Sequence, residues 1–206
     1  SNGEMSVAFL EKGNPNITWE TNTNFNAGIE FGVLQNRISG SIEYFNRKTT
    51  DMLMAFPTAP SLGYSSYYAN VGDMSNKGIE VDLNFTPIRS KNVQWDINVN
   101  LTHLKNKIIS LPPERRTKEV EGYYGYAGSS FFYGQGLPLY TFYMKKYAGV
   151  SEDGRSMWYK DVTDKDGKPT GERTTTTAYS EGSDYLCGNA IPDLYGGFGT
   201  SVSFFG

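Results

Sequence analysis

The most regular pattern in the sequence lies between residues 78 and 102, where apolar and polar residues alternate strictly in two runs. The apolar positions are Ile79, Val81, Leu83 and Phe85 in the first run and Val93, Trp95, Ile97, Val99 and Leu101 in the second. A period of two predicts β-strands, because successive side chains of a strand point to opposite faces. The short connection at residues 88–91 makes the pair an antiparallel hairpin.

The same alternation predicts a second hairpin ahead of the first one and a further strand near the end of the chain. Its two runs cover residues 17–31 and 38–45, and Leu34-Gln35-Asn36 forms the turn between them. The chain is thus expected to contain about five strands. The predicted segments are a loop at 1–16, a hairpin at 17–49, a long loop at 50–73, a hairpin at 74–104, a long loop region at 105–192 and a truncated strand at 193–206.

Within the region 105–192 the sequence is less regular. A local hairpin is predicted around residues 140–159, with its turn at residues 151–155, and the threonine run 174–177 is expected to be extended. No amphipathic helical pattern of useful length occurs.

The connections alternate between short and long, which bears on the fold class. In an up-and-down meander, alternate connections lie at the same end of the sheet, so the short turns share one end and the long loops share the other. Transmembrane β-barrels have this asymmetry, with short periplasmic turns and long extracellular loops. The predicted fold is all-β, an antiparallel up-and-down meander of long amphipathic hairpins that forms part of a transmembrane β-barrel. A soluble β-sandwich, with the apolar faces packed in its core, is the alternative.

Composition and charge exclude several classes of protein and site. The 206 residues carry a formal net charge of -3, which gives no basic face for nucleic acid. The mean hydropathy is -0.49, and no apolar run reaches the roughly 18 residues of a membrane-spanning helix. Cys187 is the only cysteine, so neither an intrachain disulfide nor a multi-cysteine metal site can form.

Several segments resemble, in order, the barrel of SusC/RagA-type TonB-dependent outer-membrane transporters. The similarity covers the chain from about residue 13 to its end. The matching segments are Gly-Asn-Pro-Asn-Ile-Thr-Trp-Glu-Thr at 13–21, Arg-Ile-Ser-Gly-Ser-Ile-Glu-Tyr-Phe at 37–45, Lys-Thr-Thr-Asp-Met-Leu at 48–53, Asn-Val-Gly-Asp-Met-Ser-Asn-Lys-Gly-Ile-Glu at 70–80, Gly-Gln-Gly-Leu-Pro at 134–138, Tyr-Ala-Gly-Val at 147–150, and Gly-Asn-Ala-Ile-Pro-Asp at 188–193.

The resemblance implies a barrel segment of an outer-membrane nutrient transporter. Such a transporter has a plugged barrel of about 22 strands. It takes up oligosaccharides or peptides, is energised by TonB from the periplasm, and is capped by a SusD-like surface lipoprotein. The chain lacks the plug domain and TonB box of that family, so it is interpreted as a segment of a longer polypeptide that contacts outer-membrane lipid. A soluble β-rich carbohydrate-binding or adhesin-like module is the alternative function.

Catalytic and metal-binding candidates are weak. The Asp161-x-x-Asp164-x-Asp166-Gly167 cluster lacks EF-hand ligand spacing and favours an Asp-Gly β-turn. His103, the only histidine, is expected at the base of a loop. Glu80 and Asp82 share a strand face and are interpreted as lumen-facing. The sequence therefore predicts no enzyme, no catalytic residue, no cofactor and no metal.

Aromatic side chains concentrate in the two long loop regions, at the expected extracellular end. Their flat faces could stack on sugar rings or contact a lid protein, at little cost in side-chain entropy. The alternative is that they pack the loops together or form an interfacial girdle. The candidate ligand or partner contacts are Tyr64, Tyr67, Tyr68, Tyr123, Tyr124, Tyr126, Phe131, Phe132 and Tyr133.

Overall fold

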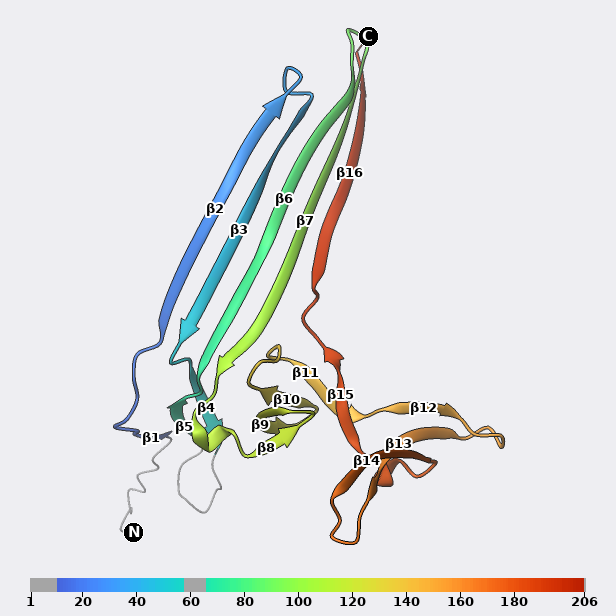
Figure 1. Cartoon of the computed structure of the whole chain (residues 1–206). Helices are drawn as coiled ribbons and strands as arrows, with labels where there is room; N and C mark the ends of the chain where they lie inside the picture. The colour runs from blue at the N-terminus through green and yellow to red at the C-terminus, as the bar shows by residue number, and fades with distance from the viewer. Residues whose placement is uncertain (1–10, 58–65, 206) are drawn as a thin grey trace, which may run out of the picture. The chain divides into compact units, whose positions relative to one another are not determined.

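The computed structural model describes residues 11–57 and 66–205 (Figure 1). The chain divides into two compact units. The first contains the residues up to Pro112 and those from Pro192 onward, and the second runs from Pro113 to Ile191. No helix among the described residues is both long and apolar enough to cross a membrane.

A sheet of five long strands dominates the first unit, in the order β16-β7-β6-β3-β2, and all of its pairings are antiparallel. The strands are β2 (Thr21–Val33), β3 (Ile38–Thr50), β6 (Asp73–Arg89), β7 (Val93–Ser110) and β16 (Leu194–Phe204). The prediction of an antiparallel meander is confirmed. β6 continues past the predicted hairpin end to Arg89, because a register shift between Phe85 and Ile88 accommodates Pro87 without breaking the pairing with β7.

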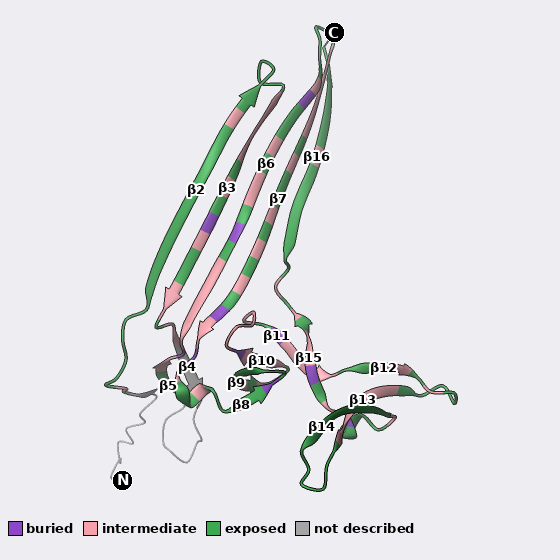
Figure 2. Cartoon of the chain, viewed as in Figure 1, coloured by how far each residue is buried: buried purple, intermediate pink, exposed green. Residues whose placement is uncertain are grey.

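The register gathers the predicted apolar positions on one face of this sheet. Ile29 on β2 lies opposite Ile42 on β3, which lies opposite Val81 on β6, which lies opposite Leu101 on β7. Many of these side chains are exposed, including Ile29 at 71% and Phe198 at 70%. Figure 2 shows the outer strands β2 and β16 exposed over almost their whole length. The apolar face is therefore continuous across the sheet, and many of its side chains are exposed among the described residues.

The opposite face is mainly polar, although two apolar side chains, Phe45 and Ile108, are buried on it. Carboxylates of Glu43 and Glu80 are register partners there. Phe45 lies on the same face but is only 4% exposed. Its ring covers Gly78, where an added Cβ would stand 2.8 Å from the ring, and Arg47 lies 5.1 Å from the ring centroid. Glycine at 78 is thus what lets Phe45 lie flat on the polar face.

The ends of the sheet differ as predicted. β2 and β3 are joined at Leu34, Gln35 and Asn36, whose φ angles are 52°, 55° and 60°, and β6 and β7 are joined through Ser90. At the other end, the predicted loop 50–73 contains the short strands β4 (Leu53–Pro57) and β5 (Ser66–Asn70). These two strands pair antiparallel, and β1 (Glu11–Lys12) joins β5 in parallel.

The second unit holds two smaller sheets, within the region 105–192 that is predicted to be a long loop region. A five-stranded sheet has the order β15-β11-β10-β9-β8, and a three-stranded sheet has the order β12-β13-β14. The elements are η2 (Pro113–Arg115), β8 (Lys118–Val120), β9 (Tyr123–Gly128), β10 (Phe131–Gly134), β11 (Thr141–Lys145), β12 (Tyr147–Val150), β13 (Ser156–Thr163), β14 (Pro169–Thr176), η3 (Tyr179–Glu181) and β15 (Asp184–Asn189).

The predicted turn at residues 151–155 is confirmed, since the Ser151 amide donates to the Arg155 carbonyl at 2.9 Å and β12 pairs with β13. The first arm of that predicted hairpin is divided, because β11 belongs to the five-stranded sheet and β12 to the other. The threonine run is extended as part of β14.

Aromatic rings build the core of the five-stranded sheet. Phe132 is completely buried, and its ring centroid lies 5.7 Å from that of Tyr143. Phe131 stacks on Phe142 at 5.2 Å and meets Tyr140 edge-on at 5.5 Å. Such pairs stabilise by about 0.5–1.5 kcal/mol each beyond their burial. Many of the aromatic side chains of this region therefore pack against one another within a sheet.

Candidate functional site

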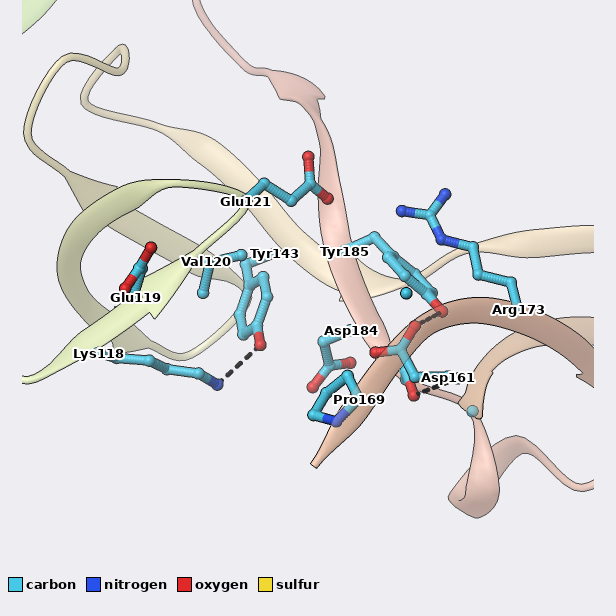
Figure 3. Close-up of a pocket in the computed structure, with 13 residues that line it drawn as sticks. Lys118, Glu119, Val120, Glu121, Tyr143, Asp161, Pro169, Arg173, Asp184 and Tyr185 are labelled. Carbon is cyan, nitrogen blue, oxygen red and sulfur yellow. Dashed lines mark hydrogen bonds between the residues drawn. The ribbon is translucent and has the colours of Figure 1, made fainter. Parts of the chain in front are cut away.

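A pocket of about 630 Å³ opens in the second unit, and strands of both of its sheets line it (Figure 3). β8 and β11 contribute one side, and β13, β14 and β15 contribute the other. The lining residues are Lys118, Glu119, Val120, Glu121, Tyr143, Asp161, Pro169, Gly171, Arg173, Gly182, Ser183, Asp184 and Tyr185. Residues more than sixty positions apart in the sequence thus meet around one cavity.

The charge of the lining is mixed, with an excess of carboxylates. Lys118 and Arg173 are cations, whereas Glu119, Glu121, Asp161 and Asp184 are anions. Four carboxylates against two cations leave a local formal charge of -2. A ligand with hydrogen-bond donors, or with charges of both signs, would find partners in this lining.

Tyr185 is buried in the wall and is contacted by two other lining residues. Its side chain is 5% exposed, its hydroxyl donates a hydrogen bond to the Asp161 carboxylate, and the Arg173 guanidinium lies 4.4 Å from its ring centroid. Burial and the adjacent Asp161 carboxylate raise the pKa of Tyr185 to about 12. The phenol therefore stays protonated at neutral pH and remains a donor.

Asp161 is held from a second side as well. Its backbone amide donates to the Ser183 hydroxyl at 3.0 Å, which ties β13 to the segment ahead of β15. Together with the bond from Tyr185, this contact fixes the carboxylate at the pocket wall.

Two lysines hold further parts of the lining in place. The Lys118 ammonium donates to the Tyr143 hydroxyl at 2.7 Å and lies 4.6 Å from the centroid of that ring. Lys145 donates to the Gly182 carbonyl at 2.9 Å and pairs with the Asp184 carboxylate at 3.4 Å. These contacts preorganise the wall before any ligand arrives.

Two carboxylates of the lining, Glu119 and Glu121, accept fewer hydrogen bonds from the pocket wall. Glu119 is bonded to the Tyr124 hydroxyl, a bond that raises the pKa of that phenol. Glu121 accepts only a long contact of 3.4 Å from the Leu186 amide. Glu121 is thus the pocket carboxylate with the most remaining capacity to accept hydrogen bonds.

The aromatic residues singled out in the sequence lie elsewhere. Tyr64 is outside the described residues. Tyr67 and Tyr68 are on β5 of the first unit. On β9 and β10 of the second unit are Tyr123, Tyr124, Tyr126, Phe131, Phe132 and Tyr133. None of the described ones lines the pocket, so their ligand contact stays a prediction.

The side chains of these aromatic residues differ in exposure. Tyr124 is 53% exposed and Tyr123 is 37% exposed, so both offer ring surface to a partner. Phe132 is fully buried and offers none. Tyr126 and Tyr133 stack on one another at 5.0 Å, and burial raises the pKa of both phenols.

Sequence reasoning missed the pocket and most of its lining. Its residues come from five strands with no common spacing, and only Asp161 was considered, as part of a cation cluster. The nearest signal was the run of charged residues at 118–121, interrupted only by Val120, which by itself resembles any solvated turn.

The other sequence candidates have structural roles. The predicted β-turn is confirmed, since Asp164 Oδ1 accepts from the backbone amides of Asp166 and Lys168, each at 2.9 Å. His103 Nδ1 contacts the Asp193 carbonyl at 2.7 Å, at the base of the loop where β16 begins. Across residues 11–57 and 66–205, no group of three His, Cys, Asp or Glu side chains is placed to hold a metal ion.

Comparison with known proteins gives a consistent result. The family model for the TonB dependent receptor-like beta-barrel matches residues 1–201. The TonB-dependent receptor SusC of Bacteroides thetaiotaomicron is 32% identical over 157 residues, which cover 76% of this chain and 15% of SusC. The TonB-dependent receptor P26 of Formosa agariphila is 27% identical over 93% of this chain and 20% of its own length.

Solved structures agree. The RagAB peptide transporter superposes with a TM-score of 0.78 at 28% identity, covering 99% of this chain and 22% of the matched chain. The RagAB peptide importer in its closed-closed state gives a TM-score of 0.73 at 29% identity. The chain spans about a fifth of the length of the first of these relatives.

Proposed function

This chain belongs to the TonB-dependent receptor-like β-barrel family and is a SusC/RagA-type segment of it, and on that premise we propose that it forms wall strands and extracellular loops of an outer-membrane nutrient transporter. The transporter takes up oligosaccharides or peptides in a TonB-dependent reaction. The observation that carries the proposal is the continuous apolar face of the five-stranded sheet, with its many exposed side chains.

The length of that face supports its placement in lipid. On β2 the apolar positions extend from Phe25 to Val33, which is 9 residues. A tilted transmembrane strand needs about 9–11 residues to cross the bilayer. The polar face, with Glu43, Glu80 and Asp82, then borders the water-filled lumen.

The edges of the sheet fit a larger barrel. Among the described residues, β2 pairs only with β3, and β16 pairs only with β7. An exposed strand edge carries unpaired backbone groups, which closure of a barrel satisfies. We therefore assign β2 and β16 to pairing with further strands of the complete transporter.

The orientation follows from the connections. Short turns at Gln35 and Lys91 lie at one end of the sheet, whereas residues 51–72 and the whole second unit are inserted at the other. Short turns are periplasmic and long loops extracellular in barrels of this kind. The second unit thus belongs to the cell exterior, where a SusD-like lipoprotein covers the loops and TonB acts from the opposite side through other parts of the protein.

The pocket is assigned to substrate capture. Its carboxylates and cations suit charged or hydroxyl-rich oligomers, and Tyr123 and Tyr124 add exposed ring surface nearby in the same unit. RagAB is described as a peptide transporter, and the resemblance to SusC-type proteins adds oligosaccharides, so both substrate classes belong in the test.

An uptake assay in cells tests the proposal. A strain lacking the full-length gene is complemented with wild-type or variant protein and supplied with defined peptide and oligosaccharide mixtures, whose depletion is followed by mass spectrometry. Glu121→Gln or Arg173→Gln should raise the half-saturating substrate concentration about tenfold, the effect of losing a hydrogen bond to a charged group.

Matched controls lie in turns of the same unit. Glu152→Gln and Lys165→Gln remove the same charges at exposed positions and should leave uptake unchanged. Energy dependence is checked in a strain without TonB. Uptake that persists there, or pocket variants with wild-type uptake of both mixtures, would overturn the assignment.

A further inference from the structure

Four lysines lie on the apolar side of the five-stranded sheet, at the end from which the long connections leave. They are Lys48 on β3, Lys77 on β6, and Lys105 and Lys107 on β7, here called the outer lysine patch. All are exposed. The register places Lys77 directly opposite Lys105, and it places Ser75 between Lys48 and Lys107.

The patch lies on the same side of the sheet as the apolar face. Lys77 is two residues from Ile79, and Lys105 is two residues beyond His103, so the strand period puts them on one face. The neighbouring row contains Tyr44 and Ile79 as register partners. The patch therefore begins where the apolar face ends.

Within the described part of the chain, no carboxylate neutralises these lysines. Ion pairs there join Lys145, Arg155 and Lys160 to acids of the second unit. The two rows of the patch are completed by Phe25, Asn46, Thr23 and Ser75, none of which is acidic.

Two acidic side chains at this end of the sheet have other partners. Asp73 accepts from the Asp51 amide at 3.1 Å, and Glu20 accepts from the Leu53 amide at 3.2 Å. Like charges placed directly opposite on neighbouring strands, as Lys77 and Lys105 are, destabilise a sheet. This cost is offset when an external anion binds between them.

We propose that the outer lysine patch binds the phosphate groups of a phosphorylated lipid in the outer leaflet. The inference rests on the membrane placement in the proposed function, which puts the patch at headgroup level, on the extracellular side. The apolar face next to it supplies contact for acyl chains, which a free phosphate ion lacks. Each lysine near an anionic membrane surface contributes about 1 kcal/mol of attraction, or roughly fivefold in affinity.

The dimensions suit such a headgroup. Neighbouring strands are about 4.8 Å apart and two residues along a strand span about 6.8 Å. The patch covers three strands and two rows, so it extends about 10 Å across and 7 Å along the sheet. Ser75 adds a neutral donor between Lys48 and Lys107, and Asn46 and Thr23 add neutral donors beside Lys77 and Lys48.

Native mass spectrometry of the full-length transporter in detergent tests the proposal. The probes are bisphosphorylated lipid A, the same lipid after removal of its phosphates, and inorganic phosphate as competitor. Wild-type protein should bind the phosphorylated lipid at least about tenfold more tightly than the dephosphorylated one.

Variants localise the effect. Lys77→Gln with Lys105→Gln should weaken binding of phosphorylated lipid A at least about tenfold, whereas Lys77→Arg with Lys105→Arg should keep it. Lys165→Gln with Lys168→Gln, which removes two exposed lysines from the second unit, is the matched control and should bind as wild type. Heat-dependent mobility in gels verifies that each variant barrel is folded.

Three results would overturn the proposal. They are equal binding of the two lipids, unchanged binding by the Lys77/Lys105 glutamine pair, and displacement of the lipid by inorganic phosphate at equal concentration. Substrate uptake is measured separately. A transporter that imports neither substrate class but still binds phosphorylated lipid A through the patch contradicts the proposed function alone.

Discussion

Ile42 lies at the centre of the apolar face, and its replacement by arginine tests which medium that face meets. Its register partners are Ile29 on β2 and Val81 on β6. Along β3 it stands midway between Ile38, near the short turn, and Asn46, in the row of the outer lysine patch. With 47% of its side chain exposed, about half of Ile42 is free of protein contact on this sheet and faces lipid in the proposed transporter.

The expected cost follows from this depth. Arginine at the bilayer midplane destabilises a transmembrane barrel by about 2–4 kcal/mol, and near the interface by about 0–1 kcal/mol. We expect Ile42→Arg to cost about 3 kcal/mol, a factor of roughly 100 in the folding equilibrium. Asn46→Arg, on the same face at headgroup level, should cost less than about 1 kcal/mol.

The opposite face provides a control on the same strand. Ser41 lies between Glu30 of β2 and Asp82 of β6 as their register partner. An arginine at 41 would meet two carboxylates on the lumen side, and opposite charges on neighbouring strands are favourable. Ser41→Arg should therefore leave stability unchanged or raise it slightly.

The assay is equilibrium unfolding of the full-length protein by guanidinium in lipid vesicles, followed by tryptophan fluorescence. The midpoints rank the three variants against wild type at constant slope. If Ile42→Arg costs no more than Ser41→Arg, or no more than Asn46→Arg, the lipid assignment of this face is wrong.

Two further predictions concern the pocket wall and a close backbone contact. The pKa of Tyr185 in the folded state, about 12, exceeds the ordinary value of 10.0, so the contribution of this phenol to stability is complete below pH 10 and is lost as the pH rises through 12. Tyr185→Phe should remove this part of the alkaline destabilisation. Melting curves of the wild-type and variant proteins across that pH range measure the difference. At Gly72, with φ at 113°, an added Cβ would stand 2.1 Å from the Ser110 carbonyl oxygen, whereas at Gly188, with φ at 83°, it would meet nothing within 4 Å. Gly188→Ala should destabilise the fold by about 1 kcal/mol through backbone strain, and Gly72→Ala should destabilise it by at least about 1 kcal/mol more. Equal unfolding midpoints for the two variants would contradict the predicted clash between the Cβ at position 72 and the Ser110 carbonyl oxygen.

The long strands of the five-stranded sheet were predictable from the sequence, because the alternation of apolar and polar residues is a local property. Whether Ile79 or Glu80 faces a given side depends only on strand geometry within a few residues. The long hairpins and the turn at Gln35 are therefore where the pattern placed them. Strand geometry also places Phe45 on the polar face, but the contact of its ring with Gly78 depends on the register between β3 and β6.

The pocket and the outer lysine patch were decided by tertiary structure. Asp161 and Tyr185 are 24 positions apart and meet only because β13 and β15 lie in neighbouring sheets. Lys77 and Lys105 become a like-charge pair only through the β6–β7 register. The local sequence determines the side of its own strand on which each residue lies. The neighbours of that residue on other strands depend on pairings between distant segments of the chain. The pocket and the outer lysine patch consist of such neighbours.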